Sequence, residues 1–144
     1  MMTSFPAPEW FLALGRMMAA EGEVFRRLGY AEVRFVVRVL DDGGKVAAAT
    51  AIEIDGYALT NAFQLDGKPF DADFAICAPR AVWAEMLEEI AREGRATLRH
   101  TLSSLALVGE SLWLESDDQL REDKFYRYNQ TLQELFNLSA RLPH

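Results

Sequence analysis

The stretch "DADFAICAPRAVWAEML", residues 71–87, decides the fold that we expect, because two periodicities meet in it almost without a loop. In its first half, Phe74 and Ile76 alternate with smaller residues, which is typical of a β-strand. In its second half, Pro79 stands where a helix can begin, and apolar residues then recur at helical spacing. The stretch therefore predicts a strand, over residues 70–78, followed directly by a helix. The apolar side of that helix must pack against either a core or a bound molecule.

Upstream of this stretch, the sequence predicts one helix and three further strands. The helix begins at Pro8 and is interrupted near Gly22, because Gly is unfavourable inside a helix. The strands are expected at residues 33–40, 45–54 and 57–65. The first two are joined by "DDGG" at 41–44, a strong hairpin turn, since Asp and Gly tolerate positive φ. Short turns of this kind indicate antiparallel neighbours.

Downstream, the helix is expected to span residues 79–93. Residues 97–106 leave helix and strand both open, because leucines at helical spacing are mixed with Thr and Ser. Residues 108–116 are interpreted as a fifth strand. The Asp117-Asp118 pair is expected to cap a final helix that runs over residues 118–138 as one element about 30 Å long.

Length and composition favour one domain. The chain has 144 residues, half of them hydrophobic, and no Gly- or Ser-rich linker divides it, so we expect a single domain over residues 1–144. Strands and helices are partly segregated along the chain. We therefore expect an α+β fold in which one largely antiparallel, five-stranded sheet is covered by helices, with helices also at the N-terminus and the C-terminus.

The charge and the cysteine content bear on partners and location. The net charge is −7, whereas nucleic acid and anionic membranes require clustered Lys and Arg, so we expect no nucleic-acid partner. No stretch approaches about 18 apolar residues, and no basic segment followed by an apolar run opens the chain. Neither stable membrane insertion nor a signal peptide is expected. The single cysteine, Cys77, cannot form a disulfide within the chain, which fits the cytoplasm.

Candidate catalytic and metal-binding residues are few. The chain has two histidines and one cysteine, and their spacing is not that of metal ligands, so no metal site is expected. It also has no Gly-rich phosphate-binding loop, so no cofactor is expected. His100 would share a helical face with Ser103 and Ser104, but a surface histidine beside polar neighbours is the simpler interpretation. Asp71 and Asp73 are two apart on the expected strand. They either serve as acid and base in a cavity or, as we expect, project into water.

Apolar side chains are the remaining candidates for a site. Trp83, Met86 and Leu87 lie on the helix at residues 79–93, and other large apolar residues lie on the final helix. Ligand pockets are mostly apolar, and Met adapts to ligands of different shape. An amphipathic stripe is also what an ordinary core requires, so from periodicity alone both interpretations stay open.

Three segments resemble the sterol carrier protein type-two family, also called the sterol-binding domain, and especially its small stand-alone prokaryotic members. "FPAPEWFLALGRMMAAEGEVFRRL" (5–28) is similar to their opening helix with its Pro-Glu-Trp start, and "DADFAICAPRAVWAEMLEEI" (71–90) is similar to their strand-to-helix joint. "LSSLALVGESLWLESDDQLREDKFYRYNQTLQELF" (102–136) is similar to their closing helix, Gly-led strand, acidic turn and last helix. The closing strand departs from the family pattern, because it contains no Lys and has Ser116 where Gly is common.

The resemblance implies a five-stranded sheet covered by helices, with an apolar tunnel between the two layers. Members of this family bind or transfer sterols, fatty acids or acyl-CoA esters and have no catalytic residues. The resemblance therefore implies a non-catalytic carrier whose partner is a hydrophobic small molecule. It places the tunnel among residues that the sequence puts on inward faces: Trp83, Met86, Leu87, Leu105, Phe125, Tyr128 and Leu132.

Two alternatives stay open beside the carrier. In the first, a small α+β cavity enzyme of the cone type uses Asp71 or Asp73 as a base. The long final helix disfavours it, because such chains usually finish in sheet. In the second, the apolar stripe of the final helix packs against another protein or against a second copy in a homodimer, and no small molecule binds.

Overall fold

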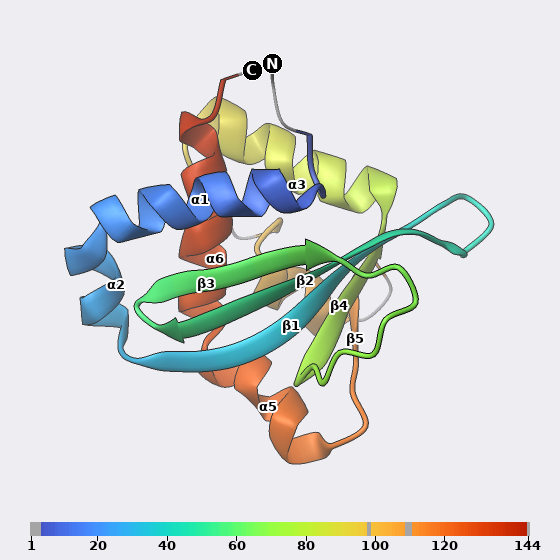
Figure 1. Ribbon diagram of the computed structural model, residues 1–144. Coiled ribbons are helices and arrows are strands. Elements are labelled where there is room, and N and C mark those ends of the chain that lie inside the picture. The colour runs from blue at the N-terminus through green and yellow to red at the C-terminus, as the bar shows by residue number, and fades with distance from the viewer. Residues whose placement is uncertain (1–3, 98, 109–110, 144) are drawn as a thin grey trace.

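The computed structural model describes residues 4–97, 99–108 and 111–143, and these form an α+β fold (Figure 1). The strands are β1 (Ala31–Leu40), β2 (Val46–Gly56), β3 (Ala58–Gln64), β4 (Phe74–Pro79) and β5 (Trp113–Glu115). The helices are α1 (Pro8–Ala20), α2 (Gly22–Leu28), α3 (Arg80–Glu93), α4 (Leu102–Val108), α5 (Gln119–Arg127) and α6 (Asn129–Asn137), followed by the 3-10 helix η1 (Leu138–Arg141). The expected five-stranded sheet with its helices is confirmed.

The strands form a single mixed sheet in the order β3-β2-β1-β4-β5. β1, β2 and β3 pair antiparallel, as the hairpin turn predicts, and β4 pairs antiparallel with β5. β4, however, pairs parallel with β1, from Phe35 opposite Phe74 to Leu40 opposite Pro79. The prediction that consecutive strands are antiparallel neighbours is wrong at this step, although the sheet as a whole is largely antiparallel.

The connection from β3 to β4 explains this difference. A strand that is not the neighbour of the preceding one, and runs in the same direction, must be reached by a crossover connection. Residues 65–73 form that crossover, and they bring Leu65 and Phe70 against Val36, on the sheet face opposite the main core. Residues 70–73, expected in the fourth strand, therefore belong to the crossover, and β4 begins only at Phe74.

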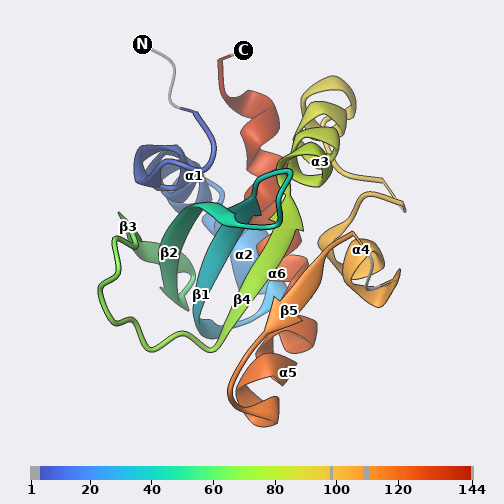
Figure 2. The same ribbon diagram turned by 90° about the vertical axis from the view of Figure 1, so that its right-hand side faces the viewer.

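The helices α1, α3 and α6 cover the other face of the sheet (Figures 1 and 2). Alternate residues of β1 point into this layer, because successive side chains of a strand lie on opposite faces. They meet the buried stripes of the helices in one continuous core, which includes Phe11, Leu14, Val33, Phe35, Val37, Ile52, Ile76, Ile90, Leu135 and Phe136. None of the helices in the described part of the chain combines the length and the apolar character needed to cross a bilayer.

The strand-to-helix joint has the form that the sequence predicts. Pro79, the last residue of β4, is also the N-cap of α3, so the helix begins at Arg80 without an intervening loop. Trp83, Met86 and Ile90 form its buried side. The helix ends at Gly94, which adopts the left-handed conformation and donates its N–H to the carbonyl of Ile90.

Replacing Gly94 by Ala is expected to lower the free energy of unfolding by about 1 kcal/mol, because a side chain is unfavourable in the left-handed conformation. Gly94 has φ 88°. Gly22→Ala is the matched control, since nothing lies within 4 Å of a Cβ added there and the residue begins α2. Urea denaturation of both variants measures the difference, and an equal effect of the two substitutions would contradict the prediction.

The final helix is not the single element expected over residues 118–138. Asp118 caps α5 by accepting the N–H of Leu120, as the sequence indicates. The helix then breaks at Tyr128, whose φ of −109° and ψ of 15° are not helical. α6 follows in a different direction (Figure 1), because it packs into the core while α5 lies at the end of the sheet.

The segment between α3 and α5 is more irregular than expected. The undecided residues 97–106 contribute most of α4, so the helical alternative is correct from Leu102 onward. The fifth strand, expected over residues 108–116, is restricted to β5, which pairs with three residues of β4. Residues 109–110 of that expectation lie outside the described residues.

Candidate functional site

The seven side chains predicted from the sequence lie in the layer between the sheet and the helices. They come from α3, α4, α5 and α6, with Tyr128 at the junction of the last two. Trp83, Met86, Phe125 and Leu132 are buried in the main core, and Leu87, Leu105 and Tyr128 are half-buried against it. The fold thus brings residues of separate helices into one apolar layer. Their contact with a ligand stays a prediction.

Five aromatic rings pack together where α1, α3 and α6 meet: Phe5, Trp10, Phe11, Trp83 and Phe136. Trp83 stacks on Phe136 with ring centroids 5.8 Å apart, and Phe5 lies 5.3 Å from Trp83 on another side. The sequence identifies only Trp83 of this group as a site residue. The amphipathic spacing of the opening helix is the signal that points to the rings of α1.

Trp83 is also held by a hydrogen bond. Its indole N–H donates to the backbone carbonyl of Arg38 over 3.0 Å, near the end of β1. A buried Trp needs such a partner for its one polar atom. The ring therefore has a fixed orientation between the sheet and α6.

A second aromatic group occupies the opposite end of the layer. Phe35 of β1 stacks on Phe74 of β4 at 5.8 Å, and Phe125 of α5 meets Phe74 edge-on at 5.7 Å. All three are at most 1% exposed. Phe125 therefore covers the end of the core where β4 begins.

Charged side chains hold α5 in this place. The carboxylate of Asp73 accepts hydrogen bonds from Arg121 Nε at 3.0 Å, Lys124 Nζ at 3.3 Å and the backbone N–H of Arg34 at 2.9 Å. We call the contacts of Asp73 with Arg121 and Lys124 the Asp73 tether. The side chain of Asp73 is only 6% exposed. The prediction that Asp73 projects into water is therefore wrong, since α5 supplies two cations that the local sequence pattern does not reveal.

Asp71 lies at the edge of the same cluster and is exposed, as expected. It accepts a hydrogen bond of 2.6 Å from Arg121, which also donates to the backbone carbonyl of Asp71. This hydrogen bond is the main reason why the pKa of Asp71 is lowered and the pKa of Arg121 is raised. Both aspartates are thus engaged with the guanidinium of one residue.

A second buried carboxylate fixes the segment after α3. Glu89 accepts from the backbone N–H of Thr97 at 2.6 Å, from the Thr97 hydroxyl at 2.9 Å, and lies 2.9 Å from His100 Nδ1. The bond from the Thr97 backbone is the main cause that lowers the pKa of Glu89 to about 2. His100 therefore faces Glu89. It precedes α4, so it does not share a helical face with Ser103 and Ser104.

Side-chain amides of α6 hold the same segment from the other side. Asn137 Oδ1 accepts the backbone N–H of Ala96, and Gln133 Oε1 accepts the backbone N–H of Leu102 at 2.7 Å. The Nδ2 of Asn137 is buried without a hydrogen-bond partner among the described residues. Hydrogen bonds from side chains of α3 and α6 thus hold the connection between α3 and α4 in place.

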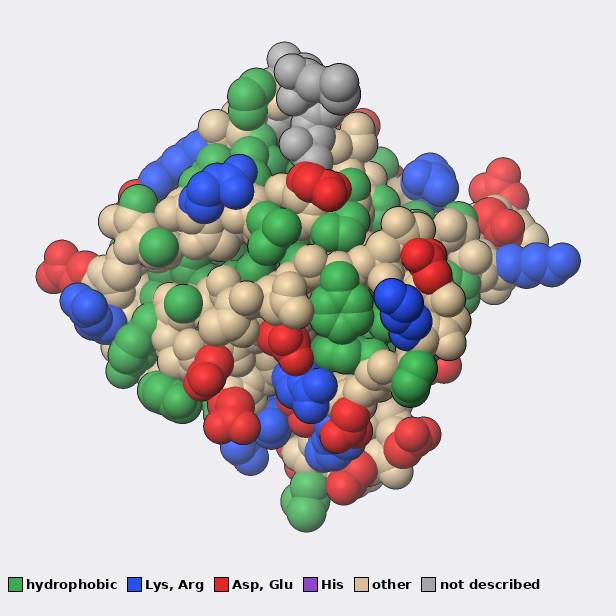
Figure 3. Space-filling view, in the orientation of Figure 1, with side chains coloured by type: hydrophobic (Ala, Val, Ile, Leu, Met, Phe, Trp, Pro, Cys, Tyr) green, Lys and Arg blue, Asp and Glu red, His purple; other side chains and the backbone are tan. Residues whose placement is uncertain are grey.

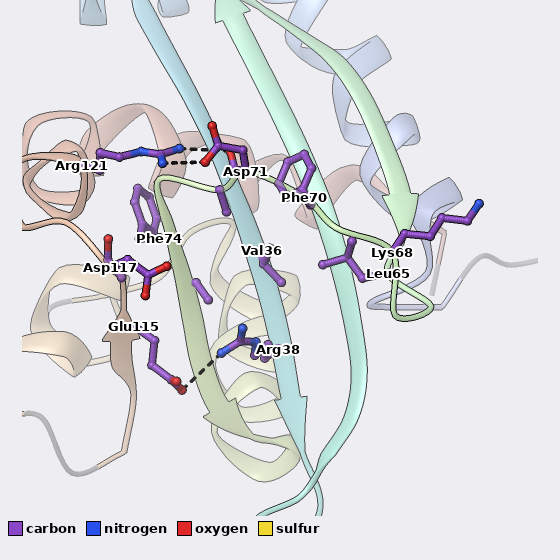
Figure 4. Close-up of a pocket in the computed structure, with 13 residues that line it drawn as sticks. Val36, Arg38, Leu65, Lys68, Phe70, Asp71, Phe74, Glu115, Asp117 and Arg121 are labelled. Carbon is purple, nitrogen blue, oxygen red and sulfur yellow. Dashed lines mark hydrogen bonds and ion pairs between the residues drawn. The ribbon is translucent and has the colours of Figure 1, made fainter.

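A groove of about 350 Å³ lies on the opposite face of the sheet (Figure 4). Its lining includes Val36 of β1 and Ala75 of β4, with Leu65 and Phe70 of the crossover on one side and Glu115 on the other. Arg38 pairs with Glu115 over 3.3 Å. Arg121, which also lines the groove, pairs with Asp71, so both of these arginines have acidic partners there.

Cys77 lies on the same sheet face, beneath Arg38 and Glu115. Burial, followed by the hydrogen bond to Glu115, raises the pKa of its thiol to about 12. A thiol is nucleophilic only as the thiolate, so Cys77 is not an activated cysteine. Within the part of the chain that the structure describes, no group of three or more His, Cys, Asp and Glu residues is placed to hold a metal ion.

Comparison with solved structures identifies the fold. No family model and no curated protein matches this chain in sequence. A crystal structure of a sterol carrier protein 2 superposes with a TM-score of 0.70 at 23% identity, over 97% of this chain and 100% of that chain. A conserved hypothetical protein from Thermus thermophilus gives a TM-score of 0.59 at 23% identity, over 97% of this chain and 90% of the other.

A more distant match is the sterol carrier protein 2 of Yarrowia lipolytica in its apo form. It gives a TM-score of 0.51 at 11% identity, over 91% of this chain and 89% of that chain. The similarity extends over at least 91% of this chain in all three cases. The chain therefore adopts the fold of sterol carrier protein 2, which confirms at the level of the fold the resemblance seen in the sequence.

Proposed function

We propose that this protein is a non-catalytic carrier that binds an elongated apolar small molecule, such as a fatty acid, an acyl-CoA ester or a sterol-like lipid, between the sheet and the helices. One observation carries the proposal. The seven side chains that the sequence assigns to a lipid site all belong to one apolar layer, in a chain with the fold of structures described as sterol carrier proteins.

Binding in such a layer needs no reactive group. The free energy comes from removing the ligand from water, at about 0.8 kcal/mol for each CH₂ group that is buried. About a dozen buried CH₂ groups contribute roughly 10 kcal/mol, and a micromolar Kd corresponds to about 8 kcal/mol. A long acyl chain can therefore reach micromolar affinity after part of this gain is offset by the cost of association.

The polar candidates support a role without catalysis. A general base must be free to reach a substrate proton. His100 faces the carboxylate of Glu89, and Asp73 is buried against two cations. The raised pKa of Cys77 keeps its thiol protonated. These residues have structural partners that account for their positions.

Titration with cis-parinaric acid and dehydroergosterol, two intrinsically fluorescent lipids, tests the proposal. We expect saturable binding of at least one of them with one site per chain. Native mass spectrometry of protein purified from its own host measures in addition which molecule is retained and whether the chain forms a homodimer. Absence of saturable binding to every lipid tried, together with a protein that carries none from its host, would overturn the carrier function.

A pair of variants on α4 tests the place of binding. Leu105 is half-buried against the core, whereas Leu107, on the same helix, is 85% exposed. Leu105→Trp adds a large side chain to the layer and is expected to weaken binding by about tenfold, which corresponds to about 1.4 kcal/mol. Leu107→Trp is the same chemical change in water and is expected to leave Kd unchanged. Equal Kd values for the two variants would show that the ligand does not bind next to Leu105.

A further inference from the structure

α5 is a short, mostly polar helix that a break at Tyr128 separates from α6. It lies between the turn that follows β5 and the helix break at Tyr128. Phe125 is its buried residue, while Leu120 and Tyr126 are 76% and 50% exposed. Acidic and basic side chains gather on the surface at this end of the molecule (Figure 3). Phe125 is therefore the residue of α5 that is buried in the main core.

The Asp73 tether attaches α5 to the segment before β4, beside the hydrogen bonds of Arg121 to Asp71 and the burial of Phe125. Arg121 and Lys124 are one turn apart and lie on the same face of α5 as Phe125, because positions three and four apart are neighbours on a helix. Both reach the carboxylate of Asp73 just before β4. Hydrogen bonds between charged groups are stronger than neutral ones, although the contacts of Asp73, at 3.0 and 3.3 Å, are not among the shortest of this kind. With the side chain of Asp73 only 6% exposed, the closed position of α5 depends on these two cations.

The surface beneath α5 is apolar. Phe125 covers Phe74, and Phe74 stacks on Phe35 inside the layer between the sheet and the helices. Removal of Phe125 from this position would expose the end of that layer to solvent. α5 thus covers one end of the region in which we propose that the lipid binds.

α6 is attached in a different way. Leu132, Leu135 and Phe136 are fully buried in the core. The break at Tyr128, where Asn129 donates a side-chain hydrogen bond to the carbonyl of Tyr126, separates the two helices. The junction at Tyr128 therefore joins two helices whose attachment to the core differs.

We infer that α5 is the movable element that admits and releases the apolar molecule, and that the Asp73 tether holds it closed. The inference rests on the proposed carrier function and adds the step that controls access to its site. Salt screens exposed charges more than partly buried ones, so it weakens the pair of Arg121 with the exposed Asp71 more than the contacts of Asp73. Opening of α5, and with it ligand exchange, is therefore expected to become only slightly faster as ionic strength rises.

Asp73→Asn is the variant that separates the tether from the backbone structure. The amide oxygen of Asn can still accept the N–H of Arg34, so the hydrogen bond to β1 is kept while the negative charge is lost. Asp66→Asn, an exposed position in the crossover, is the matched control with the same chemical change. The double variant Arg121→Gln/Lys124→Gln disrupts the Asp73 tether in a second way. It removes the two cations of α5 that contact Asp73 and leaves Asp73 itself unchanged.

Two measurements on the ligand-free and the loaded protein test the inference. Amide hydrogen exchange is expected to become about tenfold faster over residues 119–127 in Asp73→Asn and in the double variant, and to stay unchanged over residues 129–137. Dissociation of cis-parinaric acid, followed by stopped-flow dilution into excess palmitate, is expected to be about tenfold faster in the same variants. Wild-type dissociation is expected to accelerate slightly between low and high salt. Asp73→Asn is expected to keep this dependence, because Arg121 still pairs with Asp71, and the double variant is expected to lose it.

The results distinguish the tether from the carrier function. If the wild type binds the lipid but Asp73→Asn releases it at the wild-type rate, the tether does not control access, whatever the function. If hydrogen exchange rises equally in α5 and α6, α5 is not an independent element, and the inference fails for that reason. If the wild type binds no lipid, the proposed function fails, and the role of α5 in ligand access fails with it.

Discussion

Replacing Trp83 by Ala is expected to lower the free energy of unfolding by about 3–5 kcal/mol, as large-to-small substitutions of buried aromatic residues do. The side chain is 1% exposed and lies between the rings of Phe5 and Phe136. Its loss leaves a cavity among three helices and the sheet. It also leaves the carbonyl of Arg38 without the indole N–H that it accepts. Urea denaturation, with the slope checked for two-state behaviour, measures the loss.

Trp113→Ala is the matched control for this prediction. Trp113 is half-buried on the opposite face of the sheet, where its indole N–H donates to Glu115. The same atoms are removed, but most of the vacated space opens to water, so we expect a loss of about 1 kcal/mol. Equal losses for the two tryptophans would show that the aromatic group at the α1–α3 end does not stabilise the fold in the way that its packing indicates.

Acid is expected to destabilise the native protein through Glu89. The pKa of this carboxyl falls from 4.5 to about 2 on folding, mainly because of the backbone N–H of Thr97. The unfolded chain therefore takes up the proton at a higher pH than the native protein does. The stability that Glu89 contributes is complete above about pH 5 and is lost as the pH falls from there toward 2. Denaturation at a series of pH values measures this profile.

Glu89→Gln isolates that contribution, and Glu88→Gln controls for it. Gln keeps an acceptor oxygen for Thr97 but no charge, so the variant is expected to be less stable than the wild type at pH 7 and to lose less on acidification. Glu88 is the exposed neighbour on the same helix, and its replacement is expected to leave the acid part of the profile unchanged. A Glu89→Gln profile parallel to that of the wild type would assign the acid sensitivity to other groups.

Local elements were largely predictable from the sequence. The junction of strand and helix at Pro79, the "DDGG" hairpin, the start of α1 at Pro8 and the cap at Asp118 depend on neighbouring residues alone. Hydrophobic periodicity also identifies which side of each helix is inward. For this reason the seven residues proposed for the site all lie on the layer between sheet and helices.

Long-range arrangements were not predictable in the same way. The residues next to Asp73 in the chain do not indicate that Arg121 and Lys124 of α5 contact its carboxylate. No Gly or Pro lies near Tyr128 that would predict the helix break there. It follows from the different surfaces that α5 and α6 meet, one at the sheet end and one in the core.

The sequence by itself determined the kinds of elements, most of their limits and the apolar faces that they turn inward, because these follow from spacing and from turn residues within a few positions. Only the tertiary structure decided that β4 pairs parallel with β1, that residues 65–73 cross the outer face, and that the final helical segment divides at Tyr128. The reason is physical. Each of these features depends on contacts between segments far apart in the chain, whose free energy exists only once those segments have met.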